Sequence, residues 1–197
     1  MVQIKLDPTI NYIISGIERS GTSMLMQILD NGKIPVSSDE KRKPDENNPK
    51  GYYELEGGKI INKLIDGIFP FDKYKGTFIK ITAYGLKFLP PGNYKIIYSE
   101  RNIDEILYSM EKMAQIKDGN REETKQTFLK LNCMIKSSIK NRTDCKILYI
   151  NYNQILENPK GEIEKILEFI KTEEADVTSM IKTIDKKLYR QRHSTNA

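Results

Sequence analysis

Short apolar runs alternate along the chain with segments in which apolar residues recur at helical spacing. Runs rich in β-branched and aromatic residues predict strands, whereas apolar side chains three and four positions apart predict helices. The predicted strands are, in chain order, residues 12–15, 77–81, 94–99 and 146–150. The predicted helices are residues 22–29, 60–65, 103–113, 122–140, 163–170 and 175–188.

The alternation of strands and helices, with connections too long for hairpins, predicts the α/β fold class. We expect a single domain over residues 1–197, built as a doubly wound parallel sheet flanked by helices. In such a sheet, ligands bind at the carboxyl ends of the strands, where the strand order reverses. The composition agrees, because 38% hydrophobic and 30% charged residues indicate a globular chain rather than a disordered or membrane-embedded one.

Helix caps and loops are also marked in the sequence. Asn102 is expected to cap the helix that follows it, with Glu105 three residues on as a variant of the capping box. Residues 32–51 are polar and contain three prolines, which predicts a long surface loop. Loops of that length often carry function.

The charge balance fits a small anionic ligand better than nucleic acid. Lysine and arginine number 32 against 27 aspartates and glutamates, a net charge of +5 spread over the chain. The densest basic cluster, 41–43, is flanked by acids, so we expect no nucleic-acid partner. Cys133 and Cys145 lie in no metal-binding spacing, and we expect both to be reduced and no metal to be bound.

The chain carries no readable targeting or membrane signal. Residues 1–8 lack the apolar stretch of a signal peptide, and no segment is long and apolar enough to span a membrane. We therefore expect a cytoplasmic protein. Its oligomeric state leaves no trace in the sequence.

The segment between the first predicted strand and the first predicted helix, Gly16–Ser23, has the spacing of a phosphate-binding loop. Glycines allow the sharp turn, the backbone amides point inward, and the helix N-terminus adds a positive dipole, so the loop binds an anion. A Walker loop carries a lysine at the position of Thr22, whereas the cation available here is Arg19. A P-loop kinase for a nucleotide or small metabolite stays open, since its loop also puts a hydroxyl, here that of Ser23, near Mg²⁺.

Two motifs resemble those of the sulfotransferase family. Residues 19–23 resemble the loop that holds the 5′-phosphosulfate of 3′-phosphoadenosine 5′-phosphosulfate (PAPS), in which a basic residue before Ser-Gly-Thr grips the bridging and sulfuryl oxygens. Arg101 and Ser109, with seven residues between them, resemble the Arg-x7-Ser pair that holds the 3′-phosphate. The resemblance covers about residues 12–169 and implies these cofactor-binding residues: Arg19, Ser20, Gly21, Thr22, Ser23, Arg101 and Ser109. C-terminal basic residues also reach this phosphate in relatives, which suggests Arg190 and Arg192.

The resemblance further implies a general base that takes the proton of the acceptor. Members that act on small molecules use a histidine, but the sole histidine, His193, lies near the end of the chain. Carbohydrate- and protein-directed members use a glutamate. Glu54 is the first candidate, because residues 48–54 resemble a segment of bacterial sulfotransferases with carbohydrate or lipid-like acceptors, and Asp39 in the loop is the second. The other carboxylates considered are Glu40, Glu46 and Glu56.

Together these motifs imply an enzyme, a PAPS-dependent sulfotransferase acting by in-line displacement on a hydroxyl or amine acceptor, with Arg19 stabilising the transferred group. The acceptor is expected to be a small molecule, a carbohydrate or a lipid-like compound. A catalytically silent nucleotide-binding module is a further alternative. Lys80 is expected either to point into the crevice or to cap the sheet edge, and Tyr52 and Tyr53 either to stack on a sugar or adenine or to pack at the rim.

Overall fold

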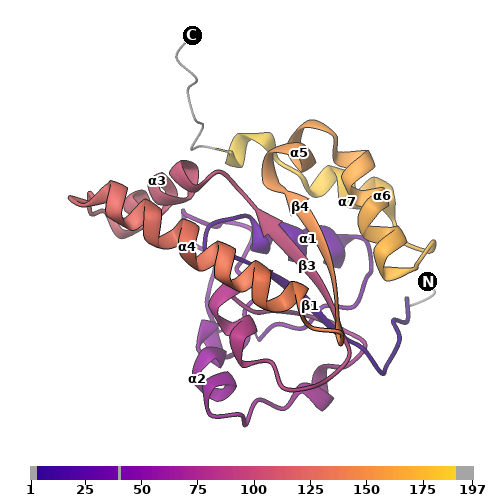
Figure 1. The fold of residues 1–197 in the computed structure, drawn as a ribbon. Helices are drawn as coiled ribbons and strands as arrows, with labels where there is room; N and C mark the ends of the chain where they lie inside the picture. The colour runs from indigo at the N-terminus through magenta and orange to yellow at the C-terminus, as the bar shows by residue number, and fades with distance from the viewer. Residues whose placement is uncertain (1–3, 40, 190–197) are drawn as a thin grey trace.

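The computed structural model describes residues 4–39 and 41–189, which contain a parallel sheet of four strands (Figure 1). Ile13 of the first strand pairs with Ile79 on one side and with Ile96 on the other. The chain therefore proceeds from β1 to one side of the sheet and then to the other, and the strand order reverses between β1 and β3. The predicted parallel sheet is confirmed. In the spatial order of the sheet, the strands are β2 (Phe78–Lys80), β1 (Asn11–Gly16), β3 (Tyr94–Glu100) and β4 (Cys145–Asn151).

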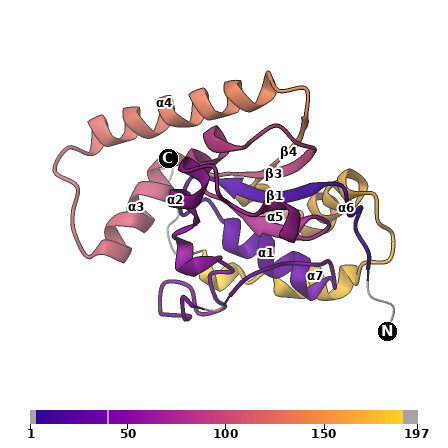
Figure 2. The same ribbon diagram turned by 90° about the horizontal axis from the view of Figure 1, so that it is seen from below.

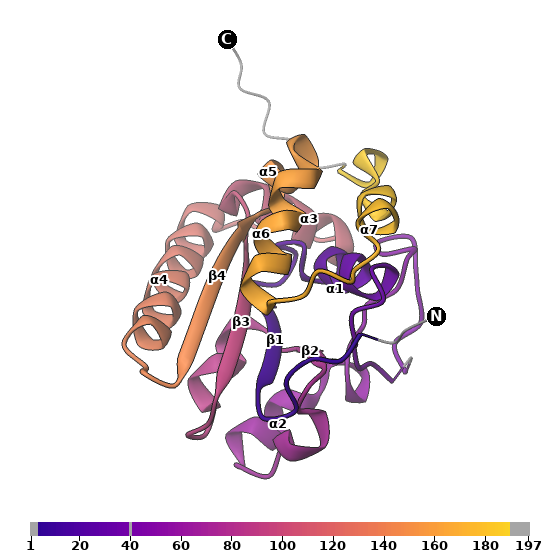
Figure 3. The same ribbon diagram turned by 90° about the vertical axis from the view of Figure 1, so that its right-hand side faces the viewer.

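Helices cover both faces of this sheet, as expected for an α/β fold. One face carries α2 (Ile60–Ile65), the 3-10 helix η3 (Ala83–Phe88), α3 (Ile103–Ala114) and α4 (Arg121–Lys140). The other face carries α1 (Thr22–Asn31), α5 (Tyr152–Glu157), α6 (Pro159–Ile170) and α7 (Val177–Thr183). Figure 2 and Figure 3 show α4 on one side of the strands and α1 and α7 on the opposite side. No helix in the described residues is both long and apolar enough to cross a membrane.

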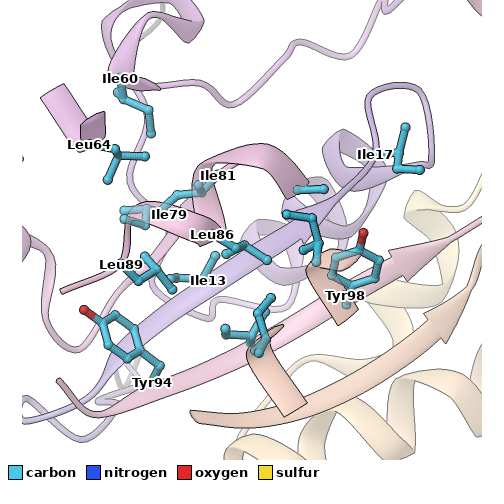
Figure 4. Packing of buried hydrophobic residues seen from close by; sticks show 14 of the residues in the cluster. Ile13, Ile17, Ile60, Leu64, Ile79, Ile81, Leu86, Leu89, Tyr94 and Tyr98 are labelled. Carbon is cyan, nitrogen blue, oxygen red and sulfur yellow. The ribbon is translucent and has the colours of Figure 1, made fainter. Parts of the chain in front are cut away.

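Alternating side chains of each strand fill two separate hydrophobic clusters. Ile13 belongs to the cluster under α2, α3 and α4, whereas Ile14 belongs to the cluster under α1 and α6, and both side chains are fully buried. Ile96 and Ile97 repeat this alternation on β3. Figure 4 shows part of the first cluster. Burial on both faces explains why the strands read as continuous apolar runs.

The structure differs from the predicted elements in the last helix, in two short helical elements and in the second strand. The helix predicted over 175–188 is divided into α7 and the 3-10 helix η4 (Lys186–Leu188), because the backbone at Ile184 is extended. The elements α5 and η3 are absent from the prediction. The second strand is shorter than the predicted 77–81. The described residues of 32–51 form a loop, as predicted.

Asn102 caps α3 as predicted. Its side-chain oxygen accepts hydrogen bonds from the amides of Asp104 at 2.8 Å and Glu105 at 3.4 Å. The Glu105 carboxylate, expected to serve the capping box, accepts a hydrogen bond from Arg101 Nε at 2.9 Å and another from the Tyr189 hydroxyl at 2.5 Å. This acid therefore belongs to the surroundings of an arginine at the end of β3.

Candidate active site

The turn from β1 into α1 forms a cradle at the carboxyl end of the sheet. Its backbone enters the left-handed region at Arg19, with φ 67°, and at Gly21, with φ 105°. A Cβ atom on Gly21 would collide with the ring of Tyr152, so this close approach requires glycine. The first amides of α1, from Thr22 on, have no partner within the helix. The cradle therefore offers amides and the positive end of a helix dipole, which suit an anion.

Gly21→Ala is expected to lower the free energy of unfolding for two reasons: the left-handed backbone disfavours alanine, and the added methyl group would collide with Tyr152. Gly67→Ala is the matched control, because Gly67 has a φ of +66° and nothing within 4 Å of an added Cβ. We expect urea unfolding to show a loss of about 1 kcal/mol for the control and roughly 1 to 3 kcal/mol more for Gly21→Ala, whose methyl group meets Tyr152. Equal losses in the two variants would contradict a tightly packed cradle.

Two arginines and a serine converge on this cradle from separate parts of the chain. Arg19 Nε donates to Ser109 Oγ at 2.9 Å, and Arg101 Nη1 donates to the carbonyl oxygen of Arg19 at 3.1 Å. The Ser99 hydroxyl of β3 donates to the carbonyl oxygen of Ser20 at 2.7 Å. Arg101 directly follows β3, and Ser109 lies on α3. The two sequence motifs are thus joined into one site.

This site opens into a cleft with a cavity volume of about 330 Å³. Ser20 is buried beneath the loop, where its amide donates to the carbonyl oxygen of Ile17 at 3.1 Å. Within the described residues, the Ser20 hydroxyl has no hydrogen-bond partner. The motif alone does not show which way a side chain of the loop points, so the cofactor role of Ser20 stays a prediction. The predicted cofactor residues that line the cleft are Arg19, Gly21, Thr22, Ser23, Arg101 and Ser109.

Arg101 is held in place by neighbouring side chains. Its Nε donates to Glu105 at 2.9 Å, and the two side chains are only 7% and 2% exposed. Its guanidinium carbon lies 4.4 Å from the ring centroid of Tyr152 and 5.6 Å from that of Tyr189. The Tyr189 hydroxyl donates to Glu105 and accepts a hydrogen bond from Asn153 Nδ2 at 3.0 Å. The end of the described chain therefore packs beside the arginine assigned to the 3′-phosphate.

Tyr152 and Tyr189 are site residues that sequence reasoning missed. Tyr152 follows β4 directly, and a position just after a strand of a parallel sheet is a signal that could have identified it. No such signal marks Tyr189, since its contact with Arg101 depends on how the C-terminal segment folds back. The predicted residues Arg190, Arg192 and His193 lie outside the described residues.

Glu54 lines the cleft within a cluster of charged groups. Its carboxylate lies 3.1 Å from Lys80 Nζ and 3.2 Å from Arg42 Nη1. Lys80 Nζ also donates to the Ser23 hydroxyl at 3.2 Å and to the carbonyl oxygen of Tyr52. Burial lowers the pKa of the Lys80 ammonium below its ordinary value, an effect that the Glu54 carboxylate opposes. Lys80 therefore points into the crevice and connects the phosphate loop with Glu54.

Two of the other carboxylate candidates, Asp39 and Glu56, are engaged outside the cleft. Asp39 accepts hydrogen bonds from the amides of Lys41, at 3.0 Å, and Glu56. Burial raises the pKa of Asp39, but hydrogen bonds from the amides of Lys41, Glu56 and Gly57 and the charge of Lys41 together bring this pKa below its ordinary value. Glu56 pairs with Lys63 at 2.6 Å. Among the described candidates only Glu54 lines the cleft, whereas Asp39, Glu46 and Glu56 do not, and Glu40 lies outside the described residues.

Tyr52 and Tyr53, which precede Glu54 in the chain, both contact other side chains of the protein. The Arg42 guanidinium covers the ring of Tyr52 at 3.6 Å from its centroid, and the Tyr52 hydroxyl donates to Asp45 at 2.8 Å. The Tyr53 hydroxyl donates to Asp30 at 2.7 Å. The structure therefore favours rim packing over an open stacking platform for both tyrosines.

The fold and this constellation together define an α/β protein with an anion-binding type of loop between its first strand and its first helix. The family model described as "Sulfotransferase domain" matches residues 10–197, and the chain belongs to the sulfotransferase family. It is 30% identical over 202 residues to "Sulfotransferase 1 family member D1" of Mus musculus. That match covers 91% of this chain, and the chain spans 63% of the length of the relative.

Solved structures show the same fold at low sequence identity. The sulfotransferase domain from the Synechococcus PCC 7002 olefin synthase has a TM-score of 0.58 and 13% identity, over 94% of this chain and 80% of that one. Mouse sulfotransferase SULT7A1, complexed with PAP, has a TM-score of 0.50 and 14% identity, over 90% of this chain and 63% of that one. At these identities, both comparisons show similarity of fold.

Proposed function

We propose that the chain transfers a sulfuryl group from PAPS to a hydroxyl or amine acceptor. The observation that carries this proposal is the convergence of Arg19, Arg101 and Ser109 on one cleft, with Glu54 beside them. Membership of the sulfotransferase family supports it, and so does the presence of PAP in one structural neighbour, since PAP is what remains of PAPS after transfer.

The residues present fit a nucleotide with two separate anionic groups. The cradle at the start of α1, whose backbone amides lie at the positive end of the helix dipole, suits the 5′-phosphosulfate. Arg101 and Ser109 both line the cleft and suit the 3′-phosphate, because guanidinium and hydroxyl groups donate hydrogen bonds to phosphate oxygens. Arg19 connects the two positions, since its side chain donates to Ser109 and its carbonyl oxygen accepts from Arg101.

PAPS, when bound, would supply a sulfuryl group whose bond to the 5′-phosphate would break as its bond to the acceptor oxygen forms. Glu54 takes the proton of the acceptor hydroxyl in this step. Arg19 and Lys80 stabilise the negative charge on the sulfuryl and leaving oxygens. Because such transition states are loose and in line, by analogy with phosphoryl transfer, positioning and charge stabilisation supply most of the rate.

A P-loop kinase remains the alternative, because Lys80 brings a cation to 3.2 Å from Ser23 although Thr22 replaces the Walker lysine. Thermal unfolding with PAP and with ATP plus Mg²⁺ separates the two functions. We expect PAP at a hundred times its dissociation constant to stabilise the fold by about 2.7 kcal/mol. Stabilisation by ATP plus Mg²⁺ and not by PAP would overturn the sulfotransferase proposal in favour of the kinase.

Arg101→Ala is expected to weaken PAP binding by about ten- to a hundredfold, because it removes a charge-assisted contact with the 3′-phosphate worth roughly 1.5 to 3 kcal/mol. Ser109→Ala is expected to cost less. Arg121→Ala is the matched control, since Arg121 pairs with Glu111 at 2.8 Å outside the cleft. Calorimetric titration with PAP measures all three variants, and an equal loss in Arg101→Ala and Arg121→Ala would contradict the assignment.

The cytoplasmic location and the single domain over residues 1–197 stay predictions. The same holds for the contribution of Arg190 to the 3′-phosphate site.

A further inference from the structure

Part of the cleft lining lies outside the nucleotide-binding motifs, and we call this part the second half of the cleft. The residues assigned to PAPS lie at the carboxyl ends of β1 and β3, whereas this second half lies over β2, the strand at the edge of the sheet. Its walls come from the segment after Glu54, from α2 and from the end of β2. The aliphatic residues that line it are Leu55, Ile60, Ile61, Leu64 and Ile81.

These aliphatic side chains converge on the backbone of η3. A Cβ built on Gly85 would lie 2.6 Å from Ile81, 3.1 Å from Leu64 and 3.6 Å from Ile61, so the three side chains pack around one glycine. Figure 4 shows Leu64 and Ile81 in this region of the cluster. Leu64 and Ile81 are 2% and 1% exposed, which makes this wall a fixed part of the core.

Few polar groups accompany this wall in the described lining. Lys59 and Thr82 line the cleft and are exposed, and the charged groups next to it are Glu54 with its partners Arg42 and Lys80. A sugar would lose water from several hydroxyl groups here and would find too few partners to replace it. An aliphatic chain, in contrast, would gain binding free energy with each methylene group that it buries against this wall.

We infer that the acceptor is a hydroxyl group at the end of an aliphatic chain, with the hydroxyl at Glu54 and the chain against Leu55, Ile61 and Leu64. This inference rests on the proposed function and names the acceptor class within it. An aliphatic chain suits the site better than an aromatic ring, because no aromatic side chain lines this half among the described residues and the Tyr52 ring is covered by Arg42.

The first test measures the binding of straight-chain alcohols from butan-1-ol to octan-1-ol by calorimetry, with and without PAP. We expect affinity to rise about fourfold for each added methylene group. Methyl glucoside is the polar probe and 2-naphthol the aromatic one. Affinity that stays flat with chain length, or either probe binding more tightly than octan-1-ol, would overturn the inference.

Ile61→Ala tests the wall itself, since Ile61 lines the cleft from a half-buried position on α2. We expect it to weaken octan-1-ol binding by about tenfold while PAP affinity is unchanged. Ile65→Ala is the matched control on the same helix, because Ile65 is 51% exposed and outside the cleft lining. Thermal unfolding of both variants shows whether the fold is kept, and Leu55→Ala serves as the second wall variant if Ile61→Ala unfolds.

Different results would overturn the sulfotransferase proposal and the inference of an aliphatic acceptor. Alcohol binding with the expected chain-length dependence but no binding of PAP would uphold the aliphatic site and overturn the sulfotransferase proposal. PAP binding with equal octan-1-ol affinity in the wild type, Ile61→Ala and Leu55→Ala would overturn the acceptor inference alone.

Discussion

Arg19→Ala is expected to lower kcat/KM for sulfuryl transfer from PAPS by about a hundred- to a thousandfold, the largest effect in this site apart from that of the general base. Arg19 is the cation of the phosphate loop, and its left-handed backbone, with φ 67°, directs its side chain across the cradle to Ser109. Its burial lowers the pKa of the guanidinium, which still stays protonated at neutral pH. Removing it leaves the charge on the sulfuryl oxygens without its nearest loop partner.

The measurement is PAP release from PAPS with a mixture of alcohols as acceptor. Arg19→Lys is the control, because it keeps the charge and loses the planar fork, and we expect it to restore part of the rate. Turnover within threefold of the wild type in Arg19→Ala would contradict the role given to the loop cation.

Glu54→Gln is expected to lower kcat by about a hundred- to ten-thousandfold, because the amide cannot accept the proton of the acceptor hydroxyl. The substitution keeps the size of the side chain, and its oxygen can still accept from Lys80 and Arg42, so we expect PAP affinity to change by less than threefold. Thermal unfolding of the variant serves as a check, since the buried Lys80 loses its carboxylate partner.

Asp39→Asn is the matched control for this prediction. Asp39 binds the backbone amides of Lys41 and Glu56, outside the cleft lining, so we expect its loss to affect stability rather than turnover. Full turnover in Glu54→Gln together with its loss in Asp39→Asn would reverse the assignment of the base.

The fold and the convergence of Arg19, Arg101 and Ser109 were predictable because their signals are local. Strands buried on both faces are continuous apolar runs, and the glycine-rich turn before a helix is a short motif with its own geometry. Arg101 and Ser109 could be recognised as a pair from their spacing. Arg101 directly follows β3, and Ser109 lies on α3, the next helix. Strand order then explains why these residues meet Arg19, since β1 and β3 are neighbours in the sheet.

The surroundings of Glu54 were not predictable in the same way. Arg42, Lys80 and Ser23 come from a loop, a strand end and a helix start, and only the packing of the loop over β2 brings them to one carboxylate. Sequence position could not separate Glu54 from Asp39, because both lie in polar segments near the expected acceptor crevice. In the structure, Asp39 accepts hydrogen bonds from the backbone whereas Glu54 lines the cleft, which supports the proposal that Glu54 is the base.

The aliphatic half of the cleft could not be predicted from the sequence, for a related reason. Ile60, Ile61 and Leu64 appear in the sequence as the core face of a helix, which they also are. Only the position of α2 beside the end of β2 shows that this face continues into the cleft.

The proposed function depends on recognition of the 3′-phosphate of the nucleotide by Arg101. Calorimetric titration of the wild type and Arg101→Ala with PAP and with adenosine 5′-phosphate, which lacks the 3′-phosphate, tests it most directly. We predict that the wild type prefers PAP by about ten- to a hundredfold and that this preference disappears in Arg101→Ala. Equal affinity of the wild type for the two nucleotides, or a preference for PAP that survives in Arg101→Ala, would contradict the account.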